Sequence, residues 1–318
     1  MRQAWRDRPE AGSTTVIRAS RHLVLFFGRT LSRAFLVLVS AYFVLRRGPE
    51  RRASRAYLTR VLKRPASLID VARHFFVFAT TTLDRVYLLT ERFRRYSITV
   101  TGPDELHGAL EHGKGVLLFG SHLGSFDSLR VLSLDRPDVA VRIVLDVEQN
   151  PAISDTLNAL HPGLANTIIN ARMAGPALAL AIREALDRNS IVALLVDRAR
   201  PGNAVLPVDF LGSTAPFPQA PWLLAAALKT PVFLSFGLFR GGNRYDLHFE
   251  RFAESVRIDR NARTAALSQV VQRFADRLSH YARLAPFNWF NFYDFWKLPQ
   301  AAEGDPSGGH DGGPGRRA

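Results

Sequence analysis

The sequence contains no cysteine among its 318 residues. This absence excludes disulfide bonds, thiolate metal sites, iron–sulfur clusters and every mechanism that uses a cysteine nucleophile. The rest of the composition, with 47% hydrophobic and 22% charged residues, is that of a globular protein able to bury an ordinary core. We therefore expect one large domain, or a domain with an appendage, whose chemistry uses other residues.

Two well-known catalytic motifs are also absent. The sequence has no Gly-x-Ser-x-Gly, so a serine nucleophile on a strand-to-helix elbow is excluded. It has no His-Glu-x-x-His or comparable ligand spacing either. We therefore expect neither a bound metal ion nor a cofactor.

Acidic residues are scarce at the start of the chain. Residues 1–100 hold 20 Lys and Arg but only 6 Asp and Glu, a balance of +14, which is the net charge of the whole chain. A nucleic-acid enzyme more often spreads positive charge over the body that holds its active site, so nucleic acid is disfavoured as a partner. A basic leading segment with apolar runs is typical of a membrane-surface anchor. We expect a neutral catalytic body tethered to a membrane by a basic arm.

The apolar runs of this arm are short. The uncharged run Ala34–Leu45 has 12 residues, whereas a helix that crosses a hydrocarbon core of about 30 Å needs roughly 20. The wider region His22–Leu45 is long enough only if Arg29 and Arg33 extend toward one membrane surface. A second stretch, Leu68–Leu89, has apolar residues at helical spacing. The sequence leaves open whether the arm spans the membrane or lies on it.

The pattern changes after Tyr96, where short β-branched runs begin to alternate with helical segments. This alternation predicts an α/β fold with a mixed, mostly parallel sheet flanked by helices. We expect residues 1–95 to form a basic, helical, membrane-associated segment and residues 96–299 to form the catalytic domain. Residues 300–318 are rich in Gly and Pro, which predicts a disordered tail.

Eight strands and six helices are predicted in the body. The strands are Ser97–Thr101, Val116–Gly120, Val139–Leu145, Thr167–Asn170, Ile191–Asp197, Val205–Phe210, Pro231–Phe239 and Tyr245–Phe252. The helices are Pro103–Glu111, Ser125–Leu134, Ile153–Leu160, Pro176–Arg188, Gln219–Leu228 and Arg260–Arg283. The turn residues Gly241–Asn243 predict that the last two strands form an antiparallel hairpin at one edge of the sheet.

The sharpest local signal is the segment Leu117–Asp127, in which a buried strand ends in a Gly-Ser turn and a histidine. Ligand crevices of open α/β sheets lie at such strand ends. Asp127, five residues after His122, can fold back to accept a hydrogen bond from Nδ1 and leave Nε2 as a base. This is the His–Asp half of a catalytic triad, in which the substrate supplies the nucleophile. The alternative is a histidine that caps a helix and an aspartate that stabilises its N-terminus.

The segment Ser121–Asp127 resembles the His-x₄-Asp block of the lysophospholipid acyltransferase superfamily, and in particular of the late acyltransferases of lipid A biosynthesis. Three further blocks follow in the family's order: Ile191–Arg198, Val208–Pro216 and Pro231–Arg240. The resemblance extends over roughly residues 20–297. It implies a glycerolipid acyltransferase-like fold at the cytoplasmic face of the cell inner membrane.

The activity implied by this resemblance is transfer of a fatty acyl chain from a thioester of acyl carrier protein or coenzyme A to a hydroxyl of a lipid or glycolipid, of the lipid A type. His122 would act as general base and Asp127 would orient it. The tetrahedral oxyanion requires donors that are already in place, for which backbone N–H groups near Gly124 and the guanidinium of Arg198 are candidates. Arg198 stands where family members commonly have glutamine, and its alternative role is a salt bridge with Asp197.

Three more residues are candidates for substrate binding: Ser121, Phe210 and Gly212. Phe210 and Gly212 either shape an acyl or acceptor groove or simply pack. The aromatic run Phe287–Trp296 belongs either to the core or to a belt at the membrane interface. Its sequence departs from the Trp-x-x-Arg/His pattern common in the family. Other acceptors, namely a glycerolipid, an aminolipid or an aryl-polyene-type lipid, therefore stay open, as does a relative that binds lipid without catalysis.

Overall fold

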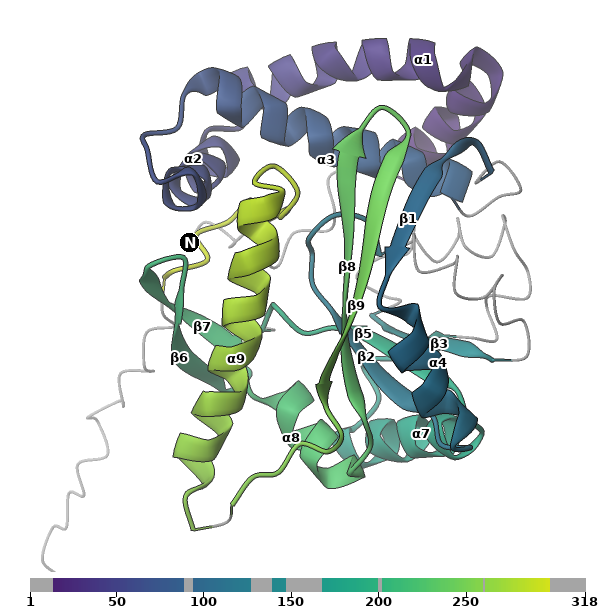
Figure 1. Ribbon diagram of the computed structural model, residues 1–318. Helices are drawn as coiled ribbons and strands as arrows, with labels where there is room; N and C mark the ends of the chain where they lie inside the picture. Colours follow the sequence, from purple (N-terminus) through teal and green to yellow (C-terminus); the bar gives the residue numbers. More distant parts are fainter. Residues whose placement is uncertain are drawn as a thin grey trace, which may run out of the picture.

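The computed structural model describes residues 14–88, 94–126, 139–146, 168–199, 202–259 and 261–297. Its helices are α1 (Thr14–Arg46), α2 (Gly48–Leu62), α3 (Leu68–Leu88), α4 (Pro103–Glu111), α7 (Gly175–Asp187), α8 (Ala220–Leu228) and α9 (Arg263–Leu284). Its strands are β1 (Ser97–Thr101), β2 (Val116–Gly120), β3 (Val141–Leu145), β4 (Ile168–Asn170), β5 (Ile191–Leu195), β6 (Val205–Phe210), β7 (Ser213–Pro218), β8 (Val232–Gly241) and β9 (Arg244–Ala253). Figure 1 shows α1 to α3 gathered at one end of the molecule and α7 and α8 at the other.

Seven strands form the main sheet in the order β1-β9-β8-β2-β5-β3-β4. Every pairing in it is parallel except that of β8 with β9. The predicted α/β fold with a mostly parallel sheet is therefore confirmed. The predicted hairpin forms, but its position at the sheet edge was wrong, because β1 pairs with the outer side of β9, Ser97 opposite Arg244.

The sheet is covered on both faces, and β2 shows why its sequence is continuously apolar. All five residues of β2 are buried. Alternate side chains point to opposite faces of a strand. Leu117 and Phe119 accordingly belong to the large core shared with α7, α8 and α9, whereas Val116 and Leu118 belong to the smaller core under α4. A strand buried on both faces in this way is the centre of a parallel sheet.

Most predicted elements of the body appear close to their expected bounds. Both bounds of each of the eight predicted strands lie within two residues of the observed bounds. The bounds of the predicted helices that the structure describes lie within three residues of the observed ones. Strand β7 was missed because its Pro216 and Pro218 argue against a strand, yet β7 pairs with β6 alone in a two-stranded sheet. The predicted helix Ile153–Leu160, all but two residues of Ser125–Leu134, and the tail 300–318 lie outside the described residues.

A buried carboxylate joins the N-terminal helices to the sheet. Asp84 of α3 is fully buried, and both of its oxygens accept hydrogen bonds from Arg29 of α1 at 2.8 Å. The hydroxyls of Tyr96 and Tyr245 donate to the same carboxylate at 2.8 and 2.9 Å. Arg29 also donates to the carbonyl of Gly242 at the tip of the β8–β9 hairpin. A buried charge needs such a set of partners, so α1 is held against α3 and the hairpin in one orientation.

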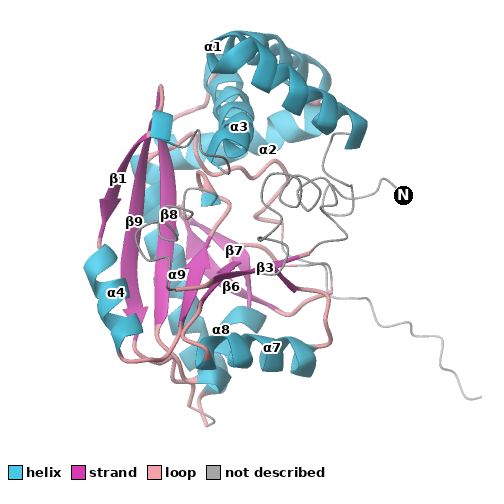
Figure 2. Ribbon diagram, turned by 90° about the vertical axis from the view of Figure 1, so that its right-hand side faces the viewer, coloured by secondary structure: helices cyan, strands magenta, loops and turns pink. Residues whose placement is uncertain are grey.

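Packing ties α2 and α3 to the main core. Tyr57 and Val61 of α2 and Val71 and Phe75 of α3 are buried members of the same core as β2 and β5. The predicted boundary between residues 95 and 96 stays a prediction. Figure 2 shows the three helices as a layer at one end of the sheet.

Candidate active site

The register of two central strands brings a histidine and an aspartate together. Strands β2 and β5 pair in parallel, with Gly120 opposite Leu195 at their carboxyl ends. His122 and Asp197 each follow two residues after those partners. Equal offsets from paired positions place the two side chains side by side, at the sheet edge where α/β proteins bind their ligands.

The contact between them is close and has a defined direction. His122 Nδ1 lies 2.7 Å from Asp197 Oδ1, and the backbone N–H of His122 donates to Asp197 Oδ2 at 3.1 Å. Because an ionised carboxylate only accepts hydrogen bonds, Nδ1 carries the proton and the basic lone pair is on Nε2. The histidine side chain is 33% exposed, whereas Asp197 is fully buried. The pair thus has the geometry of a partly exposed base and a shielded residue that orients it.

Trp289 completes the surroundings of the carboxylate. Its indole N–H donates to Asp197 Oδ2 at 3.0 Å. Burial alone would raise the pKa of Asp197. The positive charges of His122 and Arg198, and the hydrogen bonds from His122 and Trp289, have the larger opposite effect and lower this pKa to about 2. Asp197 is therefore ionised at neutral pH, which favours the imidazolium form that appears when His122 accepts a proton.

The residue predicted to orient His122 was Asp127, which lies outside the described residues. Its role stays a prediction. The described structure adds Asp197 and Trp289, which were not chosen as site residues from the sequence. Asp197 ends the predicted strand Ile191–Asp197, so the available signal was an aspartate at a strand end. Recognising it requires knowing that this strand lies next to β2, which is not a local property of the sequence.

Arg198 lies beside this pair and is connected to it through Phe290. Its guanidinium donates to the carbonyl of Phe290, whose own N–H donates to the carbonyl of His122 at 2.9 Å. The guanidinium carbon lies 5.7 Å from the centre of the Tyr293 ring. The Nε–H of Arg198 is buried and has no hydrogen-bond partner among the described residues. Within the described part of the chain, one N–H donor of this guanidinium is therefore not used.

The backbone N–H groups of Gly124 and Ser125 donate to carbonyls of the protein itself. The N–H of Gly124 donates to the carbonyl of Asn288 at 2.8 Å, and that of Ser125 donates to the carbonyl of Gly237 at 2.7 Å. Both of these donors are engaged in fixing the loop. The predicted contribution of the backbone near Gly124 to oxyanion binding stays a prediction, because the helix start after Phe126 lies outside the described residues. Ser121 is buried, and its hydroxyl has no hydrogen-bond partner among the described residues. Its predicted contact with substrate stays a prediction.

Replacing Gly124 by alanine is expected to lower the free energy of unfolding by about 3 kcal/mol or more. Gly124 has φ = +73°, and an added Cβ would overlap the carbonyl oxygen of Gly237. The measurement is urea denaturation followed by circular dichroism. Gly108→Ala is the matched control, because Gly108 lies inside α4 with open space around it and should gain about 0.5–1 kcal/mol. Equal stabilities for the two variants would contradict the close approach.

Phe210 and Gly212 belong to the β6–β7 hairpin. Phe210 is fully buried, and its ring packs against those of Trp289 and Trp296 at centroid distances of 5.0 and 5.8 Å. Gly212 has φ = +83° in the tight turn that follows β6. In the described structure Phe210 is a core residue that supports Trp289, and a contact of either residue with substrate stays a prediction. The aromatic run that contains Trp289 and Trp296 packs into this core.

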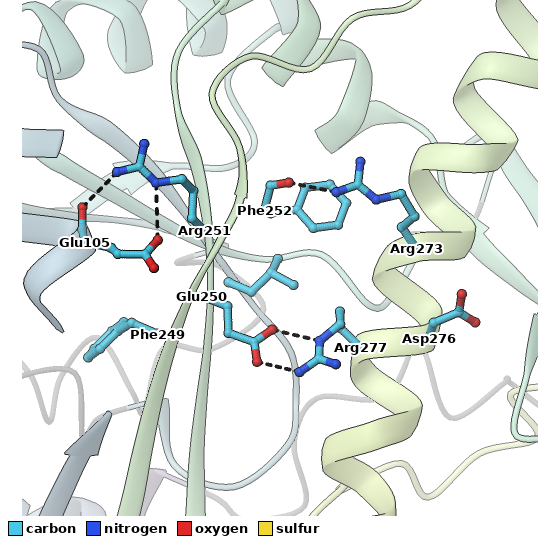
Figure 3. A pocket seen from close by; sticks show the side chains of 9 residues that line it. Glu105, Phe249, Glu250, Arg251, Phe252, Arg273, Asp276 and Arg277 are labelled. Carbon is cyan, nitrogen blue, oxygen red and sulfur yellow. Dashed lines mark hydrogen bonds and ion pairs between the residues drawn. The ribbon is translucent and has the colours of Figure 1, made fainter. Parts of the chain in front are cut away.

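A cavity of about 550 Å³ lies elsewhere, between β9, α4 and α9. Figure 3 shows that Arg251 pairs with Glu105 and Arg277 with Glu250 in its lining, whereas Arg273 donates to the carbonyl of Phe252. No described residue of the candidate site lines it, so this cavity is separate from His122. The described residues include no cluster of three or more His, Asp or Glu side chains placed to hold a metal ion.

Comparison with the sequence models of known protein families gives a match over most of the chain. Residues 65–298, more than half of the chain, match the sequence model of a family described as bacterial lipid A biosynthesis acyltransferase. The matched region includes His122, Asp197 and Trp289. Comparison with curated proteins gives no match.

Proposed function

The chain belongs to the bacterial lipid A biosynthesis acyltransferase family, and from this premise we propose that it transfers a fatty acyl chain from a thioester to a hydroxyl of a lipid A-type glycolipid, with His122 as general base. An acyltransferase of this family uses an acyl donor and acts on a lipid acceptor.

The hydrogen bond between His122 and Asp197 is the observation that carries this proposal. His122 Nε2 takes the proton of the acceptor hydroxyl as its oxygen attacks the thioester carbonyl carbon. A tetrahedral oxyanion forms and then collapses, forming the new ester as the carbon–sulfur bond breaks. The departing thiolate recovers the proton from the imidazolium, so the histidine returns to its starting state. Asp197 keeps the imidazole in the required tautomer and stabilises its charged form.

Arg198 is the proposed donor to the oxyanion. Its buried Nε–H has no hydrogen-bond partner among the described residues, and a guanidinium is suited to hold a negatively charged oxygen. A donor that is already fixed needs no reorganisation when the negative charge develops. The carbonyl of Phe290 holds the guanidinium through another nitrogen, Nη2, which supports a fixed orientation.

The first experiment is mass spectrometry of lipopolysaccharide and total lipids from cells with and without the wild-type protein, with the His122→Ala variant as control. A lipid A species that gains one acyl chain only with wild type supports the proposal. Gain of the acyl mass by another lipid would move the acceptor to a glycerolipid, an aminolipid or an aryl-polyene-type lipid. Transfer to purified acceptor from acyl carrier protein or acyl-coenzyme A, tested separately, identifies the donor. Wild-type protein that binds lipid but transfers no acyl group from either donor would favour a non-catalytic role.

We also propose that the enzyme works at the cytoplasmic face of the inner membrane, attached through α1. No described helix has both the length and the apolar character needed to cross a membrane. Five side chains spaced three or four residues apart form an apolar stripe along α1, each 56–76% exposed: Leu31, Phe35, Leu38, Tyr42 and Leu45. Such spacing places them on one helix face, and α1 is held with its other face against α3. Arginines at 46, 47, 51 and 52 follow this stripe and suit an anionic lipid surface.

Replacing both Phe35 and Leu38 by aspartate is expected to weaken binding to phosphatidylglycerol vesicles by more than about ten-fold. Each side chain contributes roughly 1.5–3 kcal/mol when its apolar surface leaves water, and the added negative charges face an anionic surface. Vesicle sedimentation measures the change. Leu180→Asp is the control, since Leu180 is also exposed, at 60%, but lies on α7 at the opposite end of the molecule (Figure 1). Unchanged sedimentation of the double variant would argue against α1 as the attachment surface.

A further inference from the structure

A buried histidine in α3 has both ring nitrogens hydrogen-bonded. His74 is fully buried, with Nδ1 2.8 Å from the hydroxyl of Ser54 in α2 and Nε2 3.0 Å from the backbone carbonyl of Trp289. A carbonyl only accepts hydrogen bonds, so Nε2 carries the proton and Nδ1 accepts from the serine. The tautomer of His74 is therefore fixed by its two partners.

His74 is neutral at physiological pH. Burial lowers the pKa of His74 to about 4, a decrease that the hydrogen bond to Trp289 opposes only in part. Its function is thus neither to exchange protons near neutrality nor to supply charge. What it supplies is a directed hydrogen bond to one backbone carbonyl from a rigid ring.

The carbonyl that His74 holds belongs to the residue that supports the catalytic pair. The indole N–H of Trp289 donates to Asp197, and the N–H of the following residue, Phe290, donates to the carbonyl of His122. Tyr57 of α2 packs against the same indole at a centroid distance of 5.0 Å and an interplanar angle of 61°. Helices α3 and α2 therefore contact Trp289, the first through a hydrogen bond to its backbone carbonyl and the second through an aromatic contact with its ring.

We propose that Ser54 and His74 are positioning residues for acyl transfer, which hold Trp289 so that its indole N–H and the adjoining backbone fix the Asp197–His122 pair. The inference rests on the proposed function of His122. It makes α2 and α3, on the membrane-associated side of the molecule, part of the support of the active site. A packing role alone would not require a polar ring whose two nitrogens must both be satisfied.

The experiment compares His74→Leu, His74→Gln and Val71→Ala in the full-length protein. Leucine removes the hydrogen bond to Trp289, whereas the amide of glutamine again offers both a donor and an acceptor group. Val71 lies one turn before His74 in the same helix, is fully buried and supports packing without a side-chain hydrogen bond. Acyl transfer is followed by release of thiol from an acyl-coenzyme A or acyl carrier protein donor, and the cysteine-free enzyme contributes no background.

We expect His74→Leu to lower kcat by about ten-fold or more with KM for both substrates nearly unchanged, because a small displacement of the pair costs rate rather than binding. His74→Gln should keep kcat within about three-fold of wild type. Val71→Ala should lower the melting temperature but not kcat. A His74→Leu enzyme with wild-type kcat, or a Val71→Ala enzyme with the same loss of kcat, would overturn the proposal.

The pH profile provides a readout that a packing defect does not change. If Trp289 moves away, Asp197 loses a donor and its charge acts more fully on His122, so the acidic limb of kcat/KM shifts to higher pH in His74→Leu. The limb should stay in place in Val71→Ala. If His74→Leu does not fold, Ser54→Ala tests the same series of contacts, from Ser54 through His74 to Trp289. We expect Ser54→Ala to lower kcat by about three-fold. An unchanged kcat would contradict the positioning role. Wild type and His122→Ala in the same assay test the proposed function independently.

Discussion

His122→Ala is expected to lower the rate of acyl transfer by about a thousand-fold or more. The substitution removes the base that takes the hydroxyl proton and the acid that returns it to the leaving thiolate, so both halves of the reaction are affected. The measurement is single-turnover transfer of a labelled acyl chain to purified lipid acceptor, which separates chemistry from product release.

The variant should remain folded and attached to membranes. Asp197 keeps two donors, the backbone N–H of residue 122 and the indole of Trp289, so its buried charge is not left unpaired. Circular dichroism and vesicle sedimentation provide the controls. Transfer at the wild-type rate by a folded variant would exclude His122 as the general base.

Asp197→Asn is expected to lower kcat by about 10³–10⁴-fold with little change in the melting temperature, a loss similar in size to that of the equivalent change in a serine-protease triad. The asparagine amide keeps an oxygen for the indole N–H of Trp289, but it presents an N–H where the imidazole needs an acceptor. Nδ1 must then accept, the proton moves to Nε2, and the base is lost through the wrong tautomer. Steady-state kinetics and thermal denaturation of the purified variant measure the two quantities.

Asp127→Asn is the comparison that assigns the orienting role. If Asp197 orients His122, Asp197→Asn should reduce kcat more than Asp127→Asn does. The reverse order would assign the role to Asp127, as the sequence motif alone predicts. Equal losses that do not add in the double variant would indicate that the two carboxylates act on the imidazole as one unit.

Local sequence patterns predicted the strands well because their signals are local. Strand β2 was placed at Val116–Gly120, and its uninterrupted apolar sequence reflects burial on both faces of the sheet. The hairpin turn at Gly241 and Gly242 could also be predicted from its residues, because glycine readily adopts the positive φ that both positions have. The turn residues do not indicate which strand pairs with the outer side of β9. That strand is β1, which lies more than a hundred residues earlier in the chain.

The same limit explains how much of the site was predicted. His122 could be chosen because a histidine directly after a buried strand is a local pattern. Its contact with Asp197 depends on strand order, and the contact of Asp197 with Trp289 depends on how the C-terminal segment returns to the sheet. Asp84 is a similar case, because its sequence suggests only an interruption of an apolar helix, whereas its partners Arg29 and Tyr245 come from distant elements.

The return of the C-terminal segment also sets when the enzyme becomes active during its synthesis. Trp289 contacts Asp197 across 92 residues of chain and His74 across 215. Contacts of such long sequence separation require large loops to close and form late in folding. A chain emerging from the ribosome can build its helices and much of its sheet first, while His122 and Asp197 still lack the indole that holds them. If His122 and Asp197 act as proposed, activity therefore begins only once the end of the domain has been translated and has folded back.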